Sequence, residues 1–193
     1  VFYFSSEHPI SDVMSGMDYF NWDVRKHLEE EKFDFIDAYS PRFYNVLPKQ
    51  LVSDVSAKDF LKRGTDSLNL LKGTATEART NKYRGVVDSI SYFLRSYELN
   101  NVLNVIEIIS SMGKATGAVH LLLMTSGMHE PIVENNMKHI CDGVIEFRMK
   151  ERGSEVEHSI LLRKMRGMIV PNRTISYVIT NKGVELETTT RVL

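Results

Sequence analysis

The sequence predicts an α/β domain with a mainly parallel sheet flanked by helices and an antiparallel β extension at its C-terminal end. Two observations point to this class. Segments rich in β-branched and aromatic residues alternate with helical patterns up to about residue 147, and short strand patterns separated by turns follow. A chain of 193 residues that is 42% hydrophobic and 25% charged is typical of a single globular domain, and it can bury a substantial core without disulfides.

The first forty residues read as strand, helix, helix and strand. Residues 1–4 have a strand pattern, and residues 10–20 place apolar side chains at helical spacing, with Ser11 as a plausible N-cap. Residues 23–32 predict a shorter, charged helix, and residues 33–39 predict the second strand.

The next segment is more polar. Residues 41–48 predict a loop, and residues 57–71 predict a helix that Gly64 weakens by about 1 kcal/mol relative to alanine. Residues 73–82 are small and polar, so we expect them to be exposed and mobile.

The stretch of residues 83–91, which contains a predicted strand, organises the rest of the chain. Val86 and Val87 suit a strand that is buried on both faces, and Asp88 stands at its carboxyl end, where open α/β sheets bind ligands. A carboxylate at that place can hold a water on Mg²⁺, whereas many such aspartates only cap the following helix. The residues by themselves leave both roles open.

A long helix, two strands and a β meander are predicted after this strand. The helix carries apolar side chains on one face from residue 102 to residue 112 and is expected to end at Gly113. Strands are expected over residues 118–124 and 143–147. The strands of the meander are expected over residues 155–163, 174–180 and 184–186.

Composition narrows the classes of partner and compartment. A net charge of −1 gives no support to nucleic acids or anionic membranes as partners, and no apolar run approaches the roughly 20 residues needed to span a bilayer. The single Cys141 excludes an intramolecular disulfide and predicts a reducing, cytoplasmic location. No His or Cys pair has the spacing of a metal site, and His120, in an apolar strand, is interpreted as a core residue.

Several short motifs follow one another in a specific order. They are Ser5-Ser6-Glu7, Met17-Asp18-Tyr19-Phe20-Asn21-Trp22-Asp23-Val24, Val86-Val87-Asp88-Ser89-Ile90-Ser91, Cys141-Asp142-Gly143-Val144-Ile145 and Arg163-Lys164-Met165-Arg166-Gly167. In this order and spacing they resemble the RecA-like ATPases of the KaiC group, across nearly the whole chain. The resemblance implies a RecA-like P-loop fold that binds ATP and Mg²⁺.

The resemblance also implies roles for individual residues. Glu7 would orient the attacking water, and Asp88 would bind Mg²⁺ through water, assisted by Ser89. Thr125 and Ser126, at the end of the next strand, could sense the γ-phosphate. The alternatives are that Glu7 is a loop carboxylate or a charge at a helix N-terminus, and that Thr125 and Ser126 are ordinary loop hydroxyls.

Lys164 and Arg166 are alternate residues, which point the same way on a strand. The resemblance implies that such a pair reaches the phosphates of a neighbouring subunit, so we expect self-association into a ring or filament. The alternative is a solvated basic edge strand, to which Arg163 also belongs. The resemblance further predicts a second acid after Glu7, where this chain has His8, and this difference bears on the strength of any catalysis.

No Gly-x-x-x-x-Gly-Lys-Ser/Thr motif occurs in the 193 residues. The segment 112–117 lacks its glycine spacing, its preceding strand and its Gly-Lys-Ser/Thr ending. We therefore expect residues 1–193 to be a single KaiC-like domain that is N-terminally incomplete, without the strand and Walker A loop that bind phosphate. On this expectation the 193 residues alone bind ATP·Mg²⁺ weakly and have low stability.

The function predicted from the sequence is an ATP-binding domain whose complete protein hydrolyses ATP at subunit interfaces. The alternative is a relative that does not hydrolyse ATP and acts as a regulatory or assembly module. Binding of single-stranded DNA is a weaker possibility, because phosphate contacts need clustered lysine and arginine residues and the net charge is near zero.

Overall fold

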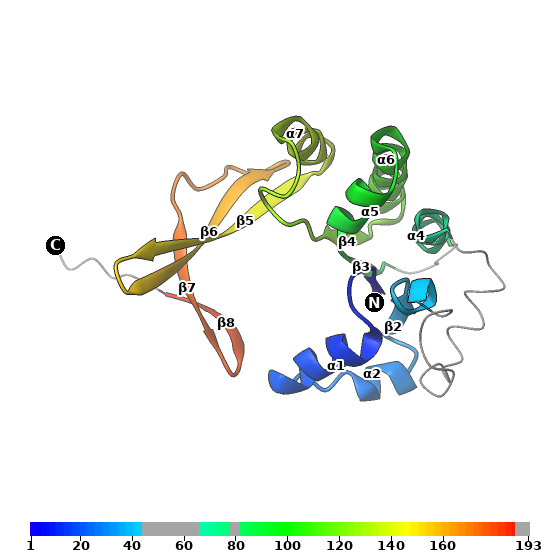
Figure 1. The fold of residues 1–193 in the computed structure, drawn as a ribbon, viewed down its shortest axis with the longest axis horizontal. Coiled ribbons are helices and arrows are strands. Elements are labelled where there is room, and N and C mark those ends of the chain that lie inside the picture. Colours follow the sequence, from blue (N-terminus) through cyan, green and yellow to red (C-terminus); the bar gives the residue numbers. More distant parts are fainter. Residues whose placement is uncertain (44–65, 78–81, 188–193) are drawn as a thin grey trace.

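The computed structural model of the protein describes residues 1–43, 66–77 and 82–187, which form two four-stranded sheets (Figure 1). The first sheet is parallel, in the order β2-β1-β3-β4, and the second is antiparallel, in the order β5-β6-β7-β8. The strands of the first sheet are β1 (Phe2–Ser5), β2 (Asp34–Asp37), β3 (Arg84–Asp88) and β4 (Val119–Leu122). Those of the second are β5 (Gly143–Arg152), β6 (Glu155–Met165), β7 (Ile175–Thr180) and β8 (Gly183–Leu186). The predicted fold class is confirmed.

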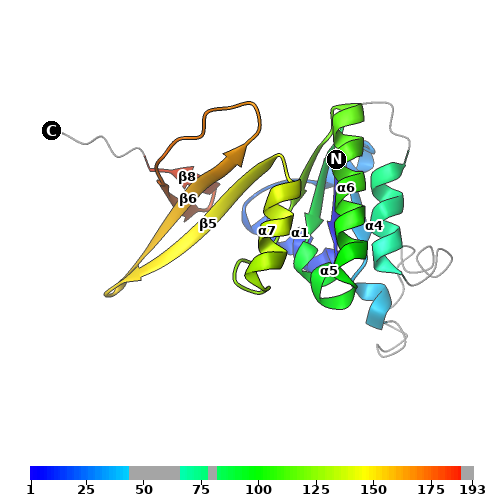
Figure 2. The ribbon, with the colours of Figure 1, turned by 90° about the horizontal axis from the view of Figure 1, so that it is seen from above.

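Three helices cover one face of the parallel sheet and form the core with it (Figures 1 and 2). These helices are α4 (Ser67–Thr76), α5 (Ile90–Ser96) and α6 (Leu99–Thr116). Phe2, Phe4 and Val87 point to this face because alternate residues of a strand share a side, and all three are fully buried. Phe2 lies over Gly85, where an added Cβ would be only 2.4 Å from the Phe2 ring, so this close approach needs glycine.

The opposite side of the sheet has less cover. Helices α1 (Ile10–Tyr19) and α2 (Arg25–Glu29) lie on this side (Figure 1). In the residues that the structure describes, β4 is an edge strand of the parallel sheet. Val119, Leu121 and Leu123, in and just after β4, expose 46%, 57% and 41% of their surface.

The strand predictions agree closely with the structure, whereas one detail of the first helix was wrong. Each of the four strands predicted before residue 125 overlaps an observed strand, and the helices predicted over residues 10–20 and 23–32 correspond to α1 and α2. Ser11, however, is not the N-cap of α1. Pro9 occupies that position with an extended backbone and no side-chain cap, and the Ser11 hydroxyl contacts Asp12 instead.

Helix α4 corrects the expectation of an exposed segment after residue 73. The helix continues to Thr76, and Thr74 and Ala75 are buried because they lie on the face that Leu71 presents to the core, three and four residues further on. Its first residue is Ser67, and Asp66 is its N-cap, with a carboxylate that accepts hydrogen bonds from two backbone N–H groups. Residues 57–65 of the predicted helix and residues 78–81 lie outside the described residues.

Four further elements differ from the expectations. Helix α6 does not stop at Gly113 but runs to Thr116, and Gly117 ends it in the left-handed conformation with φ 71°. A 3₁₀ helix, Ser40–Phe43, occupies the start of the predicted loop, whose remaining residues 44–48 are outside the described residues. The sequence analysis did not identify α5 or helix α7 (Pro131–Ile140), although proline at the first position of α7 is a common start signal.

The turn between β7 and β8 lies against the N-terminal region of the chain. A Cβ added at Gly183 would be 3.2 Å from Cζ2 of Trp22, and Figure 1 shows this hairpin ending beside α1. The predicted turn over residues 181–183 is confirmed, and its contact with Trp22 links the antiparallel sheet to the α/β part of the chain.

Within the part of the chain that the structure describes, no helix combines the length and the apolar character required for crossing a bilayer.

Candidate functional site

Glu7 and Asp88, the two carboxylates predicted to act in hydrolysis, lie at the carboxyl ends of adjacent parallel strands. Ser5, the last residue of β1, is opposite Asp88, the last residue of β3, in the sheet register. The backbone N–H of Ser6 then donates to the carbonyl oxygen of Asp88 over 2.7 Å. Glu7 follows directly, so the parallel pairing of β1 and β3 places the two acids at one edge of the sheet.

Ser89 connects these acids. Its hydroxyl donates to Oε2 of Glu7 over 2.8 Å, and its backbone N–H donates to the Ser6 hydroxyl over 2.9 Å. Ser89 is buried, and the Asp88–Ser89 peptide bond is cis. The structure therefore brings Glu7, Asp88 and Ser89 together, as the sequence predicted for a common site, but the Ser89 side chain contacts the glutamate.

Sequence reasoning missed Arg95. This residue lies near the end of α5, and its Nη2 is 2.5 Å from Oε1 of Glu7. The Glu7 side chain is 25% exposed and the Arg95 side chain 51%, so solvent screens part of their attraction. Recognition of the short helix after Asp88 would have indicated a cation at this edge.

Asp88 also has a partner that the sequence did not indicate. The Tyr3 hydroxyl donates to Oδ2 of Asp88 over 2.5 Å. Burial raises the pKa of Tyr3 well above its ordinary value, and the hydrogen bond to Asp88 and the charge of that carboxylate raise it further. Tyr3 is therefore a neutral donor at physiological pH, and it fixes the orientation of the Asp88 carboxylate.

A second arginine supports the backbone beside Glu7. The guanidinium of Arg42 donates to the carbonyl oxygen of Ser6 and lies 4.1 Å from the centre of the Tyr92 ring. It thereby links the 3₁₀ helix after β2 to the end of β1.

A cavity of about 390 Å³ adjoins Asp88. Asp88, Tyr3, His8 and Asp12 are among its lining residues, and part of its wall is aromatic because Phe20 and Trp22, just after α1, stack with ring centres 5.2 Å apart. The imidazole of His8 thus stands at the cavity beside Asp88, where the resemblance predicted a second acid.

The residues at this edge fit one of the two common kinds of Mg²⁺ site. The described residues hold no cluster of three or more His, Cys, Asp or Glu side chains that could form a cage for a metal ion. Mg²⁺ bound with a nucleotide needs no such cage, because one or two carboxylates, several waters and the phosphates complete its shell. Asp88, oriented by Tyr3 at the carboxyl end of β3, suits that arrangement.

Thr125 and Ser126 follow β4 and are exposed at the same end of the parallel sheet. The backbone N–H of Thr125 donates to the hydroxyl of Ser91, at the start of α5, over 3.0 Å. The next N–H in the chain, that of Gly127, donates to Glu134. These backbone bonds fix the loop that carries the two exposed residues.

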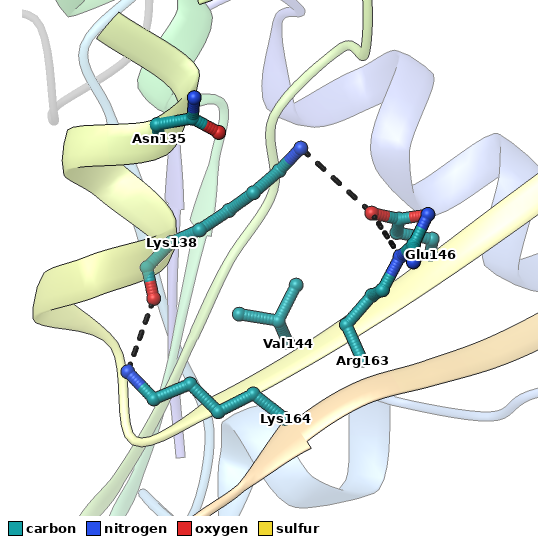
Figure 3. A pocket seen from close by; sticks show the side chains of 6 residues that line it. All are labelled: Asn135, Lys138, Val144, Glu146, Arg163 and Lys164. Carbon is teal, nitrogen blue, oxygen red and sulfur yellow. Dashed lines mark hydrogen bonds and ion pairs between the residues drawn. The ribbon is translucent and has the colours of Figure 1, made fainter. Parts of the chain in front are cut away.

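Lys164 and Arg166 contact the segment 138–142. Nζ of Lys164 donates to the carbonyl oxygens of Lys138 and His139, at the end of α7, over 3.2 and 2.8 Å (Figure 3). Nε of Arg166, one residue beyond β6, is 3.0 Å from a carboxylate oxygen of Asp142. The chain thus places this basic pair on its own α7 region and away from the Glu7 carboxylate.

The interpretation of His120 as a core residue is confirmed only in part. Its ring packs against the buried rings of Phe2 and Tyr83, with centres 6.0 and 5.4 Å away, but the residue itself is half-buried. This burial lowers the pKa of His120 below its ordinary value and favours the neutral imidazole.

Comparison with known proteins places this geometry in a family. A family model described as "ATPase: KaiC" matches residues 1–191. A UPF0273 protein of Saccharolobus solfataricus is 29% identical over 188 residues, which are 95% of this chain and 63% of that protein. A UPF0273 protein of Sulfurisphaera tokodaii is 24% identical over 193 residues, 97% of this chain and 64% of that protein. The chain therefore spans less than two thirds of the length of these two relatives.

A solved structure agrees with the fold. The crystal structure of a KaiC-like protein from the archaeon Pyrococcus horikoshii superposes with a TM-score of 0.65 at 22% identity, covering 97% of this chain and 76% of that one. The match of the family model over nearly the whole length carries more weight than either comparison with one protein. On this basis the chain belongs to the KaiC ATPase family.

Proposed function

We propose that this chain is a RecA/KaiC-like ATP-binding domain, and that the complete protein hydrolyses ATP at interfaces between its subunits. The observation that carries the proposal is the position of Glu7 and Asp88 at the ends of adjacent parallel strands, with Ser89 between them. In this fold class ligands bind at the carboxyl edge of the sheet, and phosphoanhydride hydrolysis needs both a group that positions water and a carboxylate for a metal.

Each residue has a distinct part in this proposal. Glu7 orients the attacking water, and Ser89 and Arg95 hold its carboxylate in place. Asp88 holds Mg²⁺ through water, and the ion neutralises charge on the phosphate oxygens. Thr125 and Ser126 sense the γ-phosphate from the end of β4. The phosphate-binding loop, a motif that the 193 residues lack, is supplied by another segment of the complete protein.

The proposal assigns Lys164 and Arg166 to the site of a neighbouring subunit. Their partners within the chain are carbonyl oxygens and one exposed ion pair, and such contacts can be exchanged for a phosphate at little cost. A ring or filament then completes each site with cations from the adjacent copy.

A second candidate function is a regulatory or assembly module that binds partners without hydrolysing ATP. Two contacts favour it. Arg95 forms an ion pair with Glu7, and Tyr3 donates to an oxygen of Asp88, so both acids have partners within the chain.

The deciding experiment measures ATP binding and hydrolysis by the full-length protein and three variants. Glu7→Gln should keep nucleotide affinity and lose about 100-fold or more in kcat, since it removes the group that orients water. Asp88→Asn should weaken Mg²⁺-dependent binding as well. Glu107→Gln, on an exposed position of α6, is the matched control and should behave like the parent protein.

Two outcomes would contradict the proposal. If the parent protein binds ATP·Mg²⁺ and releases no phosphate under conditions in which it is assembled, the regulatory function is correct. If Glu7→Gln and Asp88→Asn hydrolyse ATP as fast as Glu107→Gln does, the active-site residues are assigned wrongly.

A further inference from the structure

Helix α7 stands between two regions that the proposed function uses. On one side is the loop after β4, which carries Thr125 and Ser126, and on the other is the base of the β5–β6 hairpin, which carries Lys164. Figure 3 shows α7 facing β5 and β6 across a cavity of about 340 Å³. Its Met137 is 3% exposed, so the helix is anchored in the core and presents its polar side chains to both regions.

Glu134 forms the contact with the loop. Its side chain is only 10% exposed, and its Oε1 accepts the backbone N–H of Gly127 over 2.7 Å. The other oxygen, Oε2, is 3.6 Å from Nζ of Lys138, one helical turn further on. A carboxylate this deeply buried needs its partners, because an ionised group without them is costly inside a protein. The position of Glu134 is therefore tied to that of Gly127.

Lys138 extends this contact to the hairpin. Its Nζ is also 3.7 Å from Oε1 of Glu146 on β5, and the same oxygen is 3.1 Å from Nε of Arg163 (Figure 3). The other oxygen of the Glu146 carboxylate is 2.6 Å from Nη2 of Arg148. Partial burial opposes ionisation of Glu146, but the hydrogen bonds from Arg148 and Arg163 outweigh it and lower the pKa of this carboxyl. Glu146 is therefore charged at neutral pH and holds three cations together.

The β5–β6 hairpin also contacts the C-terminal end of α7. Nζ of Lys164 donates to the carbonyl oxygens of Lys138 and His139, two of the last carbonyls of the helix. A cation at this place is favourable because the carbonyl ends of a helix carry partial negative charge. Movement of α7 would therefore change the surroundings of Lys164 directly.

We propose that Glu134 and Lys138 are positioning residues that couple the loop of Thr125 and Ser126 to the basic segment 163–166 through α7. The coupling rests on the proposed function for its two ends, a γ-phosphate sensor and cations directed to a neighbouring subunit. Binding of phosphate at the loop moves the Gly127 N–H, Glu134 follows its buried hydrogen bond, and Lys138 and Glu146 pass the movement to Arg163. Occupancy of one site then adjusts the cations presented to the next.

The cost of breaking the contacts between the loop and α7 supports this proposal. Loss of the Gly127 bond would leave a buried carboxylate short of a donor, which costs more than the loss of an exposed ion pair. The helix therefore moves with the loop more easily than it separates from it. Direct contacts connect every step from Gly127 through Glu134, Lys138 and Glu146 to Arg163.

The test measures hydrogen exchange at the Gly127 amide in the full-length protein without nucleotide. Glu134→Ala removes the acceptor and should speed exchange about tenfold or more. Glu146→Gln lies on β5, outside the loop, and should still speed exchange about threefold. Lys138 then loses a partner and shifts toward Glu134, and it competes with the Gly127 N–H for the Glu134 carboxylate. Glu157→Gln, in the exposed ion pair with Arg152 at the outer end of the same hairpin, is the matched control and should leave exchange unchanged.

Hydrolysis gives the second measurement. Lys138→Met, which keeps the stem and removes the charge, should lower kcat about threefold to tenfold with KM unchanged, and Lys138→Arg should restore most of it. A purely structural role would not produce this division between kcat and KM. If the alanine variant does not fold, Glu134→Gln is used in its place: it keeps one acceptor for Gly127 but loses the charge that faces Lys138, so it should lower kcat as Lys138→Met does.

The two proposals fail in different ways. If the parent protein hydrolyses no ATP, the proposed function is wrong, and the exchange experiment still decides the coupling. If the parent protein is active but Glu146→Gln and Lys138→Met match Glu157→Gln in Gly127 exchange and in kcat, the coupling through α7 is overturned.

Discussion

The Glu7 carboxylate lies 2.5 Å from Nη2 of Arg95, on the helix that begins directly after Asp88 and Ser89. This ion pair joins the end of β1 to α5 across the carboxyl edge of the sheet. A glutamate that orients water acts through its negative charge, and an adjacent guanidinium reduces that charge. The pair holds Glu7 in position and, under the proposed function, would lower the ability of its carboxylate to orient water.

We expect Arg95→Gln to raise kcat for ATP hydrolysis about threefold to fivefold, because Glu7 keeps its bond from Ser89 and loses a neutralising cation. Nucleotide affinity should be unchanged, and the free energy of unfolding should fall by no more than about 1 kcal/mol, because the pair is partly exposed. Steady-state kinetics and denaturant unfolding measure both quantities. A fall in kcat to the level of Glu7→Gln would mean that Arg95 is required for the water-orienting geometry.

Tyr3→Phe tests whether orientation of Asp88 matters for the metal. The variant removes the hydroxyl that donates to Asp88 and keeps the ring, so packing against Phe35 is retained. Outer partners of metal-binding carboxylates commonly contribute tenfold or more to affinity, and we expect Mg²⁺-dependent ATP binding to weaken about tenfold. Binding without Mg²⁺ should not change.

The matched control for this change is Tyr19→Phe. Tyr19 is 76% exposed at the end of α1, so loss of its hydroxyl should alter neither binding nor stability. Equal affinities for Mg²⁺·ATP in the two variants, measured by titration calorimetry, would show that the Tyr3 hydroxyl does not contribute to metal binding.

The sequence could indicate where strands end and which residues stand at those ends. Val86 and Val87 are β-branched and precede an acid, and a parallel sheet brings such ends together without any knowledge of the register. Glu7 and Asp88 could therefore be assigned to one edge, and the structure places them there.

Contacts between segments far apart in the sequence could not be obtained in this way. Arg95 and Glu7 are separated by 88 residues, and the Tyr3 hydroxyl meets Asp88 across 85. Such pairs depend on side-chain rotamers and on the exact helix ends. The end of α6 shows the same limit, because both Gly113 and Gly117 are compatible with a stop and the helix ends at Gly117.

Gly183→Ala examines the contact between the antiparallel sheet and the N-terminal region. Gly183 has φ 108°, which strains any residue with a Cβ, and the new methyl would be 3.2 Å from Trp22. We expect a loss of about 1–3 kcal/mol in unfolding free energy and a changed emission from Trp22. Gly153→Ala is the control, since its φ is 63° and nothing lies within 4 Å of the added Cβ. If both variants lose the same stability and emission is unaltered, the turn does not depend on Trp22.

Lys164 and Arg166 provide the test of shared sites. Within the chain, Lys164 contacts the end of α7 and Arg166 contacts Asp142. On the proposed function, these two cations take part in hydrolysis at the site of a second subunit. We expect the full-length Glu7→Gln protein and the Lys164→Ala/Arg166→Ala protein to be inactive separately. When they are mixed, some interfaces combine an intact Glu7 from one subunit with intact cations from the next. If equal amounts of the two proteins assemble at random, about a quarter of the interfaces have this combination, and activity should return to about a quarter of the parent value.

The mixing experiment needs a control that separates loss of the contacts with α7 from loss of charge at the neighbouring site. Lys164→Gln retains hydrogen-bond donors for the carbonyl oxygens of Lys138 and His139 while removing the charge. If the charge acts across the interface, Lys164→Gln/Arg166→Gln should be as inactive alone as the alanine variant and should be rescued equally by Glu7→Gln. If the glutamine variant is active alone, the two cations serve to hold the helix. If light scattering shows co-assembly and no activity returns on mixing, the basic pair is a solvated edge and the sites are not shared between subunits.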